Sequence, residues 1–187
     1  MSRQRGGMAV NIDIALRPVR EGDAAAIAAA FASHPDMIRQ GNVTDLAGAR
    51  RYIARILEVP DSRLAWVIAR DDTDERIGMV RIDADWDEKN GWFSYWLHHD
   101  YWGRGMMSRA AAAVADWALR ERGLERLELG HRVNNPASGG VARAAGFLKE
   151  GTERGKFLIN GQRIDVDLYG RLASDPFPHY HPVPFRG

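Results

Sequence analysis

One stretch near the middle of the chain constrains its fold most, because a strand pattern, a glycine turn, a helix pattern and a second strand pattern follow one another directly. Trp92 to Leu97 is an aromatic run typical of a strand. From Gly105 to Arg122 apolar residues recur at helical spacing, and Gly123 follows as a stop signal. Leu127 to Val133 then alternates apolar and polar residues. A strand, a crossover helix and a second strand imply a parallel pair within a sheet.

The strands before this unit are predicted to be antiparallel. Val10 to Leu16 alternates apolar and polar residues until Pro18 stops the pattern. Leu64 to Ala69 and Ile77 to Ile82 are apolar runs, and the charged residues 71 to 75 between them suit a hairpin connection. Together with the aromatic run, these segments predict an antiparallel meander.

Two helices are expected between the first strand and this meander. Asp23 stands at the N-cap position of the alanine-rich segment Ala24 to Ala32. A second helix is predicted from Asp45 to Leu57, before Pro60. The segment between them, His34 to Thr44, has the composition of a loop.

The C-terminal part of the core is predicted to contain one more helix and a hairpin. Asn135-Pro136 begins the helix, which ends near Gly146, and Phe147 starts the next strand. Asn160-Gly161 is a two-residue hairpin signal between residues 156 to 159 and 163 to 169.

The length of 187 residues fits one domain better than two. We expect a flexible arm at residues 1 to 9, a single domain at 10 to 173 and an extended, proline-rich tail at 174 to 187.

Composition limits the classes of partner. With 26 basic and 25 acidic residues the net charge is +1, so no nucleic-acid partner is expected. No apolar stretch is long enough to span a bilayer and no signal segment opens the chain, so no membrane partner is expected either. The absence of cysteine excludes disulfides, thiolate metal sites and a cysteine thioester, and the cytoplasm is the default location.

Gly103 and Gly105 lie between the aromatic strand and the start of a helix, where free N–H groups and the helix dipole favour an anion. The structural alternative is an ordinary strand-to-helix turn. A P-loop would need Gly-Lys-Ser/Thr after a longer loop, and a dinucleotide site would need a third glycine in an all-parallel sheet. Neither fits an antiparallel meander leading into the turn.

Several motifs stand out along the chain: Tyr101-Trp102-Gly103-Arg104-Gly105-Met106-Met107, Asn135-Pro136-Ala137-Ser138, Gly146-Phe147, Leu16-Arg17-Pro18 with Asp23, and Gly161 with Asp165 and Tyr169. These motifs and the order of the elements resemble the GNAT superfamily of N-acetyltransferases, most of all its ribosomal-protein N-terminal (RimJ/RimL-like) branch. The resemblance implies an α/β (α+β) fold: a mixed, mostly antiparallel sheet whose central parallel pair splays apart, flanked by helices.

The resemblance also implies acetyl-CoA as co-substrate. Its pyrophosphate would lie on backbone amides of residues 104 to 108, and its pantetheine arm would pair with the main chain of residues 96 to 98. The implied cofactor-binding residues are Trp96, Leu97, His98, Gly103, Arg104, Gly105, Met106, Met107, Ser108 and Asn135. The histidines lack the spacing of a metal site, so no metal is expected.

The catalytic residues are less well defined by the resemblance. Ser138 is the candidate acid for the departing thiolate, since Ala142 stands where another branch has a tyrosine, although water can also serve. Helix capping is the alternative for Asn135, and first-turn exposure is the alternative for Ser138.

The general base is open. Gly155-Lys156-Phe157 occupies the stretch where the branch can place a glutamate. His131 remains as a candidate, as do Asp165 or Asp167 through water. For His131 a structural role, a strand histidine with a satisfied hydrogen bond, is favoured.

The implied activity is acetyl transfer to a primary amine, by analogy a protein or peptide N-terminus such as that of a ribosomal protein. Polyamines, aminoglycosides and amino acids are the alternative acceptors. A non-catalytic acyl-CoA-binding regulatory domain is the alternative of a different class, and the sequence leaves a homodimer open.

Overall fold

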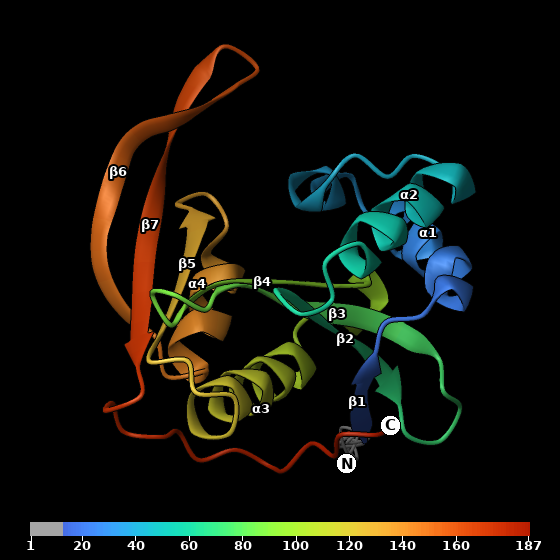
Figure 1. Cartoon of the computed structure of the whole chain (residues 1–187). Coiled ribbons are helices and arrows are strands. Elements are labelled where there is room, and N and C mark those ends of the chain that lie inside the picture. Colours follow the sequence, from blue (N-terminus) through green and yellow to red (C-terminus); the bar gives the residue numbers. More distant parts are fainter. Residues whose placement is uncertain (1–12) are drawn as a thin grey trace, which may run out of the picture.

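A seven-stranded, mostly antiparallel sheet runs through the computed structural model, which describes residues 13 to 187 (Figure 1). Its order is β1-β2-β3-β4-β5-β7-β6. The strands are β1 (Ile14–Pro18), β2 (Arg63–Arg70), β3 (Arg76–Asp85), β4 (Asn90–Leu97), β5 (Arg126–Arg132), β6 (Leu148–Ile159) and β7 (Gln162–Leu172). The described chain thus has the predicted mixed α/β fold.

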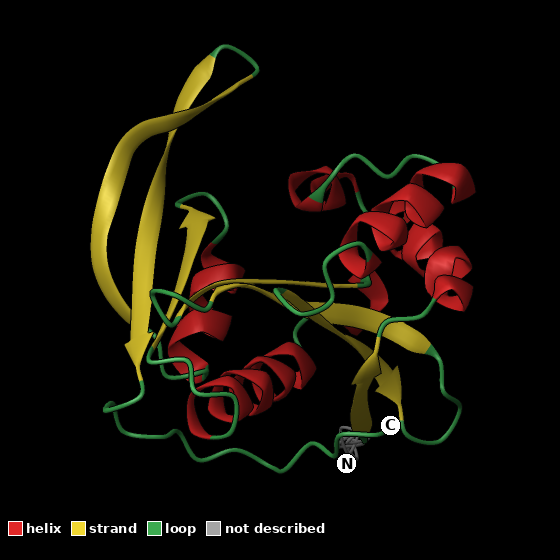
Figure 2. Cartoon of the chain, viewed as in Figure 1, coloured by secondary structure: helices red, strands yellow, loops and turns green. Residues whose placement is uncertain are grey.

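Helices cover both faces of this sheet (Figure 2). The pair α1 (Ala24–Ala32) and α2 (Leu46–Leu57) packs on one face, and α3 (Met106–Arg120) with α4 (Pro136–Ala144) packs on the other. Three short 3-10 helices join them: η1 (Glu21–Asp23), η2 (Pro35–Gln40) and η3 (His99–Tyr101). The core therefore has two parts, one on each side of the sheet.

The parallel pair predicted for the centre of the sheet is confirmed, and it splays. β4 pairs with β5 only from Asn90 to Trp92, opposite residues 126 to 128. At Gly91 a Cβ would lie 2.6 Å from the Ile82 side chain and 3.0 Å from that of Leu127, so a glycine permits the close packing there. Beyond Trp92 the strands part, which leaves the β5-facing edge of β4 unpaired.

Asp23 is the N-cap residue of α1, as predicted, although its side chain makes no cap bond. Its carboxylate accepts from Arg17 and from the Arg20 amide instead. One other expectation was wrong in part. The segment from His34 is not only loop, because η2 forms after Pro35, and the His34 ring accepts from the Asp36 amide at 3.1 Å. The expected strand from Val10 and the arm at 1 to 9 lie outside the described residues, apart from the strand's end in β1.

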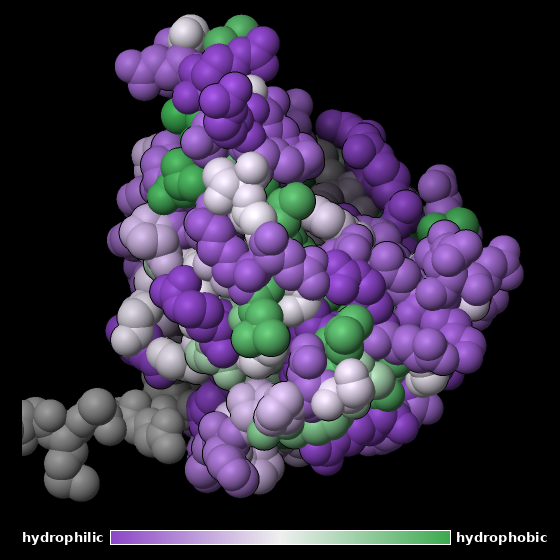
Figure 3. Space-filling model, turned by 90° about the vertical axis from the view of Figure 1, so that its left-hand side faces the viewer, coloured by the Kyte–Doolittle hydropathy of each residue, from purple (hydrophilic) through white to green (hydrophobic). Residues whose placement is uncertain are grey.

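The predicted hairpin at Asn160-Gly161 is confirmed. Both residues have positive φ, 49° and 78°, which is the conformation of a tight type I′ turn. β6 and β7 extend beyond the rest of the molecule (Figure 1). The side that carries β6 is mostly hydrophilic, with hydrophobic residues scattered over it (Figure 3).

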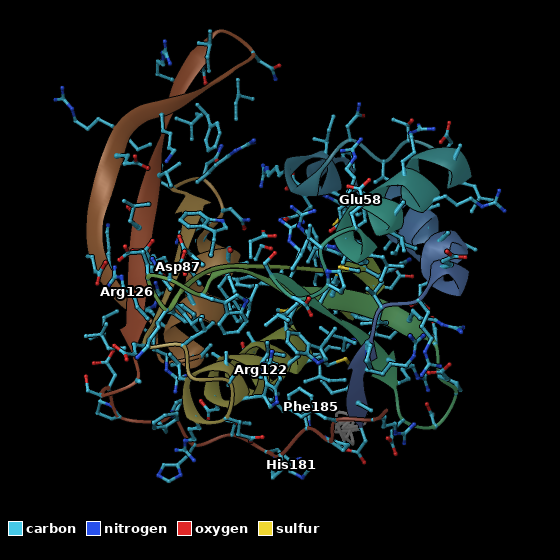
Figure 4. The ribbon with its side chains drawn as sticks, viewed as in Figure 1. Glu58, Asp87, Arg122, Arg126, His181 and Phe185 are labelled. Atoms are coloured by element: carbon cyan, nitrogen blue, oxygen red, sulfur yellow. The ribbon has the colours of Figure 1, made fainter. Side chains whose placement is uncertain are left out.

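The C-terminal tail runs beneath α3 and ends at β1 (Figure 4). The Leu16 amide donates to the Pro184 carbonyl at 2.9 Å, and the Arg186 amide donates to the Leu16 carbonyl at 2.7 Å. Phe185 contacts the rings of Trp66 and Trp117. The tail thereby covers the edge of the sheet at β1.

Candidate active site

A cavity of about 410 Å³ lies where β4 and β5 part. This central cavity is bounded by η2 on the α1/α2 side of the sheet and by the starts of α3 and α4 on the other side, so it passes through the sheet. Its walls include these residues singled out in the sequence: Trp96, Leu97, Gly103, Gly105, Met106, Met107, Ser108, Asn135 and Ser138. His98 and Arg104 are not part of its walls.

The glycine turn exposes backbone donors to the central cavity. Gly103 and Gly105 have φ of 74° and 73°, in the left-handed region that favours glycine. The first helical bond of α3 runs from the Arg109 amide to the Gly105 carbonyl at 3.1 Å. The amides of residues 106 to 108 therefore have no acceptor within the helix, and the positive end of the helix dipole lies beside them. This arrangement suits a phosphate.

The free edge of β4 supplies further backbone groups. The His98 amide donates to the Ile77 carbonyl at 2.7 Å, so it belongs to the β3–β4 ladder. Since backbone groups alternate along a strand, those of Leu97 and Tyr95 face the gap toward β5. The Leu97 carbonyl accepts from the Trp102 indole at 2.7 Å. An amide-bearing arm in the gap would therefore meet Tyr95 and Leu97 rather than the His98 amide.

Ser138 lies against a tyrosine that the sequence analysis did not select. The Tyr95 hydroxyl is 2.7 Å from the Ser138 carbonyl, to which it donates, and 3.0 Å from the Ser138 hydroxyl. Burial raises the pKa of Tyr95 to about 12, more than the hydrogen bond with Ser138 lowers it. Tyr95 therefore keeps its proton at neutral pH.

Asn135 caps a helix, which is the structural alternative considered for it, and it also lies at the central cavity. Its side chain caps α4 by accepting from the Ser138 amide at 3.4 Å, and the residue also lines the central cavity. The capping contact holds the start of α4 beside the Tyr95–Ser138 pair.

Some wall residues were not predicted from the sequence, among them Tyr95 and the residues of η2. Tyr95 lies in an aromatic run, where the side chains on both faces of the strand are large, so the pattern does not single one of them out. Strand alternation predicts only that Tyr95 and Trp96 lie on opposite faces of the sheet. The residues of η2, which are Asp36, Met37, Arg39 and Gln40, were assigned to a loop whose path the sequence does not define.

None of the three candidate bases lines the central cavity. The His131 Nδ1 is 2.9 Å from the Arg132 carbonyl, and its ring packs under α4, where a Cβ at Gly139 would lie 2.6 Å from Nε2. Asp165 accepts from the Gly155 amide at 2.7 Å. Asp167 is bonded to Thr152 at 2.7 Å and to Lys149 at 2.8 Å. These contacts give all three residues structural roles in β5, β6 and β7.

Residues 13 to 187 contain neither a metal-binding cluster nor a membrane-spanning helix. No group of three or more histidine or acidic side chains in this part of the chain could hold a metal ion. None of the described helices is long and apolar enough to cross a membrane.

Comparison with known proteins gives matches of both sequence and fold. The family model described as "Acetyltransferase (GNAT) domain" matches residues 13–148. The ribosomal-protein-serine acetyltransferase of Escherichia coli is 32% identical over 102 residues, a match that spans 54% of this chain and 57% of the relative. The chain thus covers little more than half of that relative's length.

Solved structures share the fold at lower identity. RimL, a ribosomal alpha-N-protein acetyltransferase solved in complex with coenzyme A, has a TM-score of 0.77 at 24% identity, over 86% of this chain and 94% of RimL. A dodecameric spermidine N-acetyltransferase from Vibrio cholerae has a TM-score of 0.71 at 18% identity, over 87% and 95%. At these identities the two likenesses show the fold alone.

Proposed function

Because the chain belongs to the family of GNAT acetyltransferase domains, we propose that it transfers acetyl from acetyl-CoA to a primary amine, namely the N-terminal amine of a protein or peptide. The observation that carries this proposal is the central cavity, which joins a glycine turn with free backbone amides to a gap between two splayed strands.

The residues around the cavity fit the donor. The amides of Met106, Met107 and Ser108 would hold the pyrophosphate, and the backbone of Tyr95 and Leu97 would pair with the pantetheine arm. Bound there, the donor supplies an acyl group activated as a thioester. Asn135 would face the same arm from the start of α4.

The protein would promote the reaction mainly by positioning. In the reaction the amine nitrogen bonds to the acyl carbon, the carbon–sulfur bond breaks, and a proton passes from nitrogen to sulfur. Orientation of two reactants can contribute about 7 to 11 kcal/mol. Because the Tyr95 hydroxyl already donates to the Ser138 carbonyl, the Ser138 hydroxyl is the one of the two that can turn and donate to a group that becomes negative near the start of α4.

Tyr95 stays protonated throughout this scheme, because burial raises its pKa to about 12. A thiol has a pKa of about 8.5, so a thiolate would not permanently deprotonate this phenol or the less acidic hydroxyl of Ser138, and a hydroxyl could only pass a proton on. Tyr95 would hold Ser138 in place while the proton travels from the amine, through Ser138 or water, to the sulfur. No described side chain is needed as a strong base in this scheme, because proximity and a neutral amine suffice.

The acceptor class is supported by the relatives. The 32% identical relative is named for acetylation of a ribosomal protein, which favours a protein N-terminus. The spermidine N-acetyltransferase shares the fold and keeps a polyamine as the alternative acceptor. Cytoplasmic location, a homodimer and the lack of a nucleic-acid partner stay predictions.

Thiol release from acetyl-CoA tests the proposal. We expect turnover with short peptides that have free N-termini, and less with polyamines, aminoglycosides and free amino acids. Peptides with a blocked N-terminus are the matched control. If acetyl-CoA binds and no acceptor of a broad panel turns over, the chain is a non-catalytic acyl-CoA-binding domain instead.

A further inference from the structure

A second cavity, of about 540 Å³, lies between α2 and the strands β2 and β3. Arg51 and Arg55 of α2, Arg63 of β2 and Arg81 of β3 all line it, so we name it the arginine cavity. Its remaining walls are backbone, neutral side chains and Tyr52, and no acidic residue is part of them. Four guanidinium groups around one hollow create a positive potential that attracts an anionic group.

The described residues supply only part of that negative charge. Asp83 pairs with Arg63 Nε at 2.8 Å and with Arg81 Nη2 at 2.9 Å. The side chains of Arg51 and Arg55 form no ion pair among residues 13 to 187. Asp45 lies near Arg51, since a Cβ at Gly48 would be 3.2 Å from Asp45 Oδ1 and 3.7 Å from Arg51 Nη2. The Arg81 Nε is buried without a hydrogen-bond partner among residues 13 to 187. A carboxylate in the cavity would pair with the exposed guanidinium groups of Arg51 and Arg55.

The arginine cavity is next to the central cavity. The Tyr52 hydroxyl accepts from the Trp96 indole at 3.3 Å, and Tyr52 lines one cavity while Trp96 lines the other. Arg81 is paired in register with Ser94, two residues before Trp96 on the same face of β4. Two residues of strand span about 7 Å, so the two sites are roughly two or three extended residues apart.

Positive charge continues to the rim of the central cavity. Arg39 of η2 lines that cavity on the α1/α2 side. Burial lowers the pKa of Arg132, and the positive charge of Arg39 lowers it further, which indicates that the two guanidinium groups are near each other. Asp36 pairs with Arg39 at 2.9 Å and offsets one of the two charges. A polyamine on this side would meet net repulsion.

We propose that the arginine cavity binds an acidic side chain of the acceptor, so that the preferred acceptor is a peptide N-terminus with an aspartate or glutamate two or three residues after the reacting amine. This inference rests on the proposed function and adds the charge of the acceptor to it. The acidic side chain would reach Arg81 and Arg51 while the amine lies at the Trp96 end of the central cavity.

Two peptides that differ only by glutamate or glutamine at the third position test the proposal. We expect KM for the glutamate peptide to be about tenfold lower, as hydrogen bonds to charged groups imply. Arg51→Gln should reduce this preference by about threefold to tenfold, and Arg81→Gln should reduce it at least as much, through KM and not kcat. Arg51 is exposed, so its variant should fold even if the Arg81 variant does not.

The matched control is Arg50→Gln, which removes the neighbouring charge on α2 from a side chain outside the cavity. It should retain the full preference. Equal KM values for the two peptides, or the same loss in the Arg50 and Arg51 variants, would overturn the proposal while acetyl transfer itself stands. Better turnover of spermidine or of free glutamate than of the acidic peptide would also overturn it.

Calorimetry separates this inference from the proposed function. The two peptides are titrated into the full chain saturated with coenzyme A, where no transfer occurs. Tighter binding of the glutamate peptide, weakened by salt, supports the arginine cavity even if no turnover is found. Equal binding of both peptides would contradict it.

Discussion

At the scale of single residues, Tyr95 has the position best suited to support Ser138. Its hydroxyl contacts both the carbonyl and the hydroxyl of Ser138. Tyr95→Phe should lower kcat about fivefold to tenfold, since one neutral hydrogen bond contributes about 1 kcal/mol. Because the pKa of Tyr95 is raised to about 12, it loses its proton only far above neutrality, and the variant should keep the pH profile of the unaltered chain between about pH 6 and pH 10. Steady-state rates of both proteins over that range provide the measurement. If the unaltered chain shows an ionisation in its pH profile that the variant lacks, Tyr95 does not act only as a support for Ser138.

Gly105 permits a second prediction at this scale. Nothing lies within 4 Å of a Cβ built on it, so a substitution strains only the backbone, whose φ is 73°. Gly105→Asp should cost about 1 to 2 kcal/mol in stability and abolish the melting shift with coenzyme A, by placing negative charge beside the phosphates. In the unaltered chain, coenzyme A at about a hundred times its Kd should add about 2.7 kcal/mol to the free energy of unfolding.

Gly123→Asp is the matched control for that change. Gly123 has a φ of 81° and equally open space, but it lies beyond the other end of α3. Its variant should lose similar stability and keep the melting shift. A shift retained in the Gly105 variant would show that the phosphates lie elsewhere.

Asp23 and Arg17 give a prediction about acid stability. Both are buried, and Asp23 Oδ1 is 2.7 Å from Arg17 Nη2. Burial raises the pKa of Asp23, but the hydrogen bonds from Arg17 and Arg20 and the charges of Arg17 and Arg76 outweigh it, so the pKa is lowered. The pair's contribution is therefore complete above the unfolded pKa of about 3.9 and is lost as pH falls through the lower, folded value.

Asp23→Asn should reduce the free energy of unfolding by about 2 to 3 kcal/mol at neutral pH, because the buried Arg17 loses its nearest carboxylate and keeps only Asp74, at 3.4 Å, as a charged partner. It should also remove the loss of stability below about pH 4 that this carboxylate causes. Urea unfolding at several pH values measures both effects. Asp87→Asn, at an exposed position, is the control; an equal effect of the two changes would contradict the prediction.

At the scale of elements, the periodicity of the sequence predicted the helices and strands, but it did not predict which of them lie next to each other in space. The strand, helix and strand around Gly105 were predicted because their periods differ and glycines mark the boundaries. η2 was missed because Pro35 and the His34 cap act only locally. The arginine cavity was beyond prediction, since its four arginines come from α2, β2 and β3, which the sequence does not place side by side.

The sequence predicted which residues lie at the site better than it predicted what each residue does there. Nine residues singled out in the sequence line the central cavity, because they follow the ends of strands and start helices. His131, Asp165 and Asp167 could not be judged, since the contacts that occupy them come from α4 and β6.

At the scale of the whole molecule, the tail joins the C-terminus to the first described strand. Phe185 packs on Trp66 and Trp117, and it is 42% exposed. Phe185→Ala should therefore cost about 1 to 2 kcal/mol in urea unfolding, in line with a half-buried aromatic ring. His181→Ala, on an exposed part of the same tail, should cost little; similar losses would mean that the ring contacts contribute nothing specific.

The parting of β4 and β5 has a consequence for amide hydrogen exchange. The N–H groups of Tyr95 and Leu97 face a gap in which no strand accepts them, whereas the amide of His98 is bonded to Ile77. In the free protein the first two amides should exchange with deuterium faster than their neighbours, although they lie in the middle of a sheet. Coenzyme A should slow them selectively, so the ligand would complete the sheet as a missing strand does.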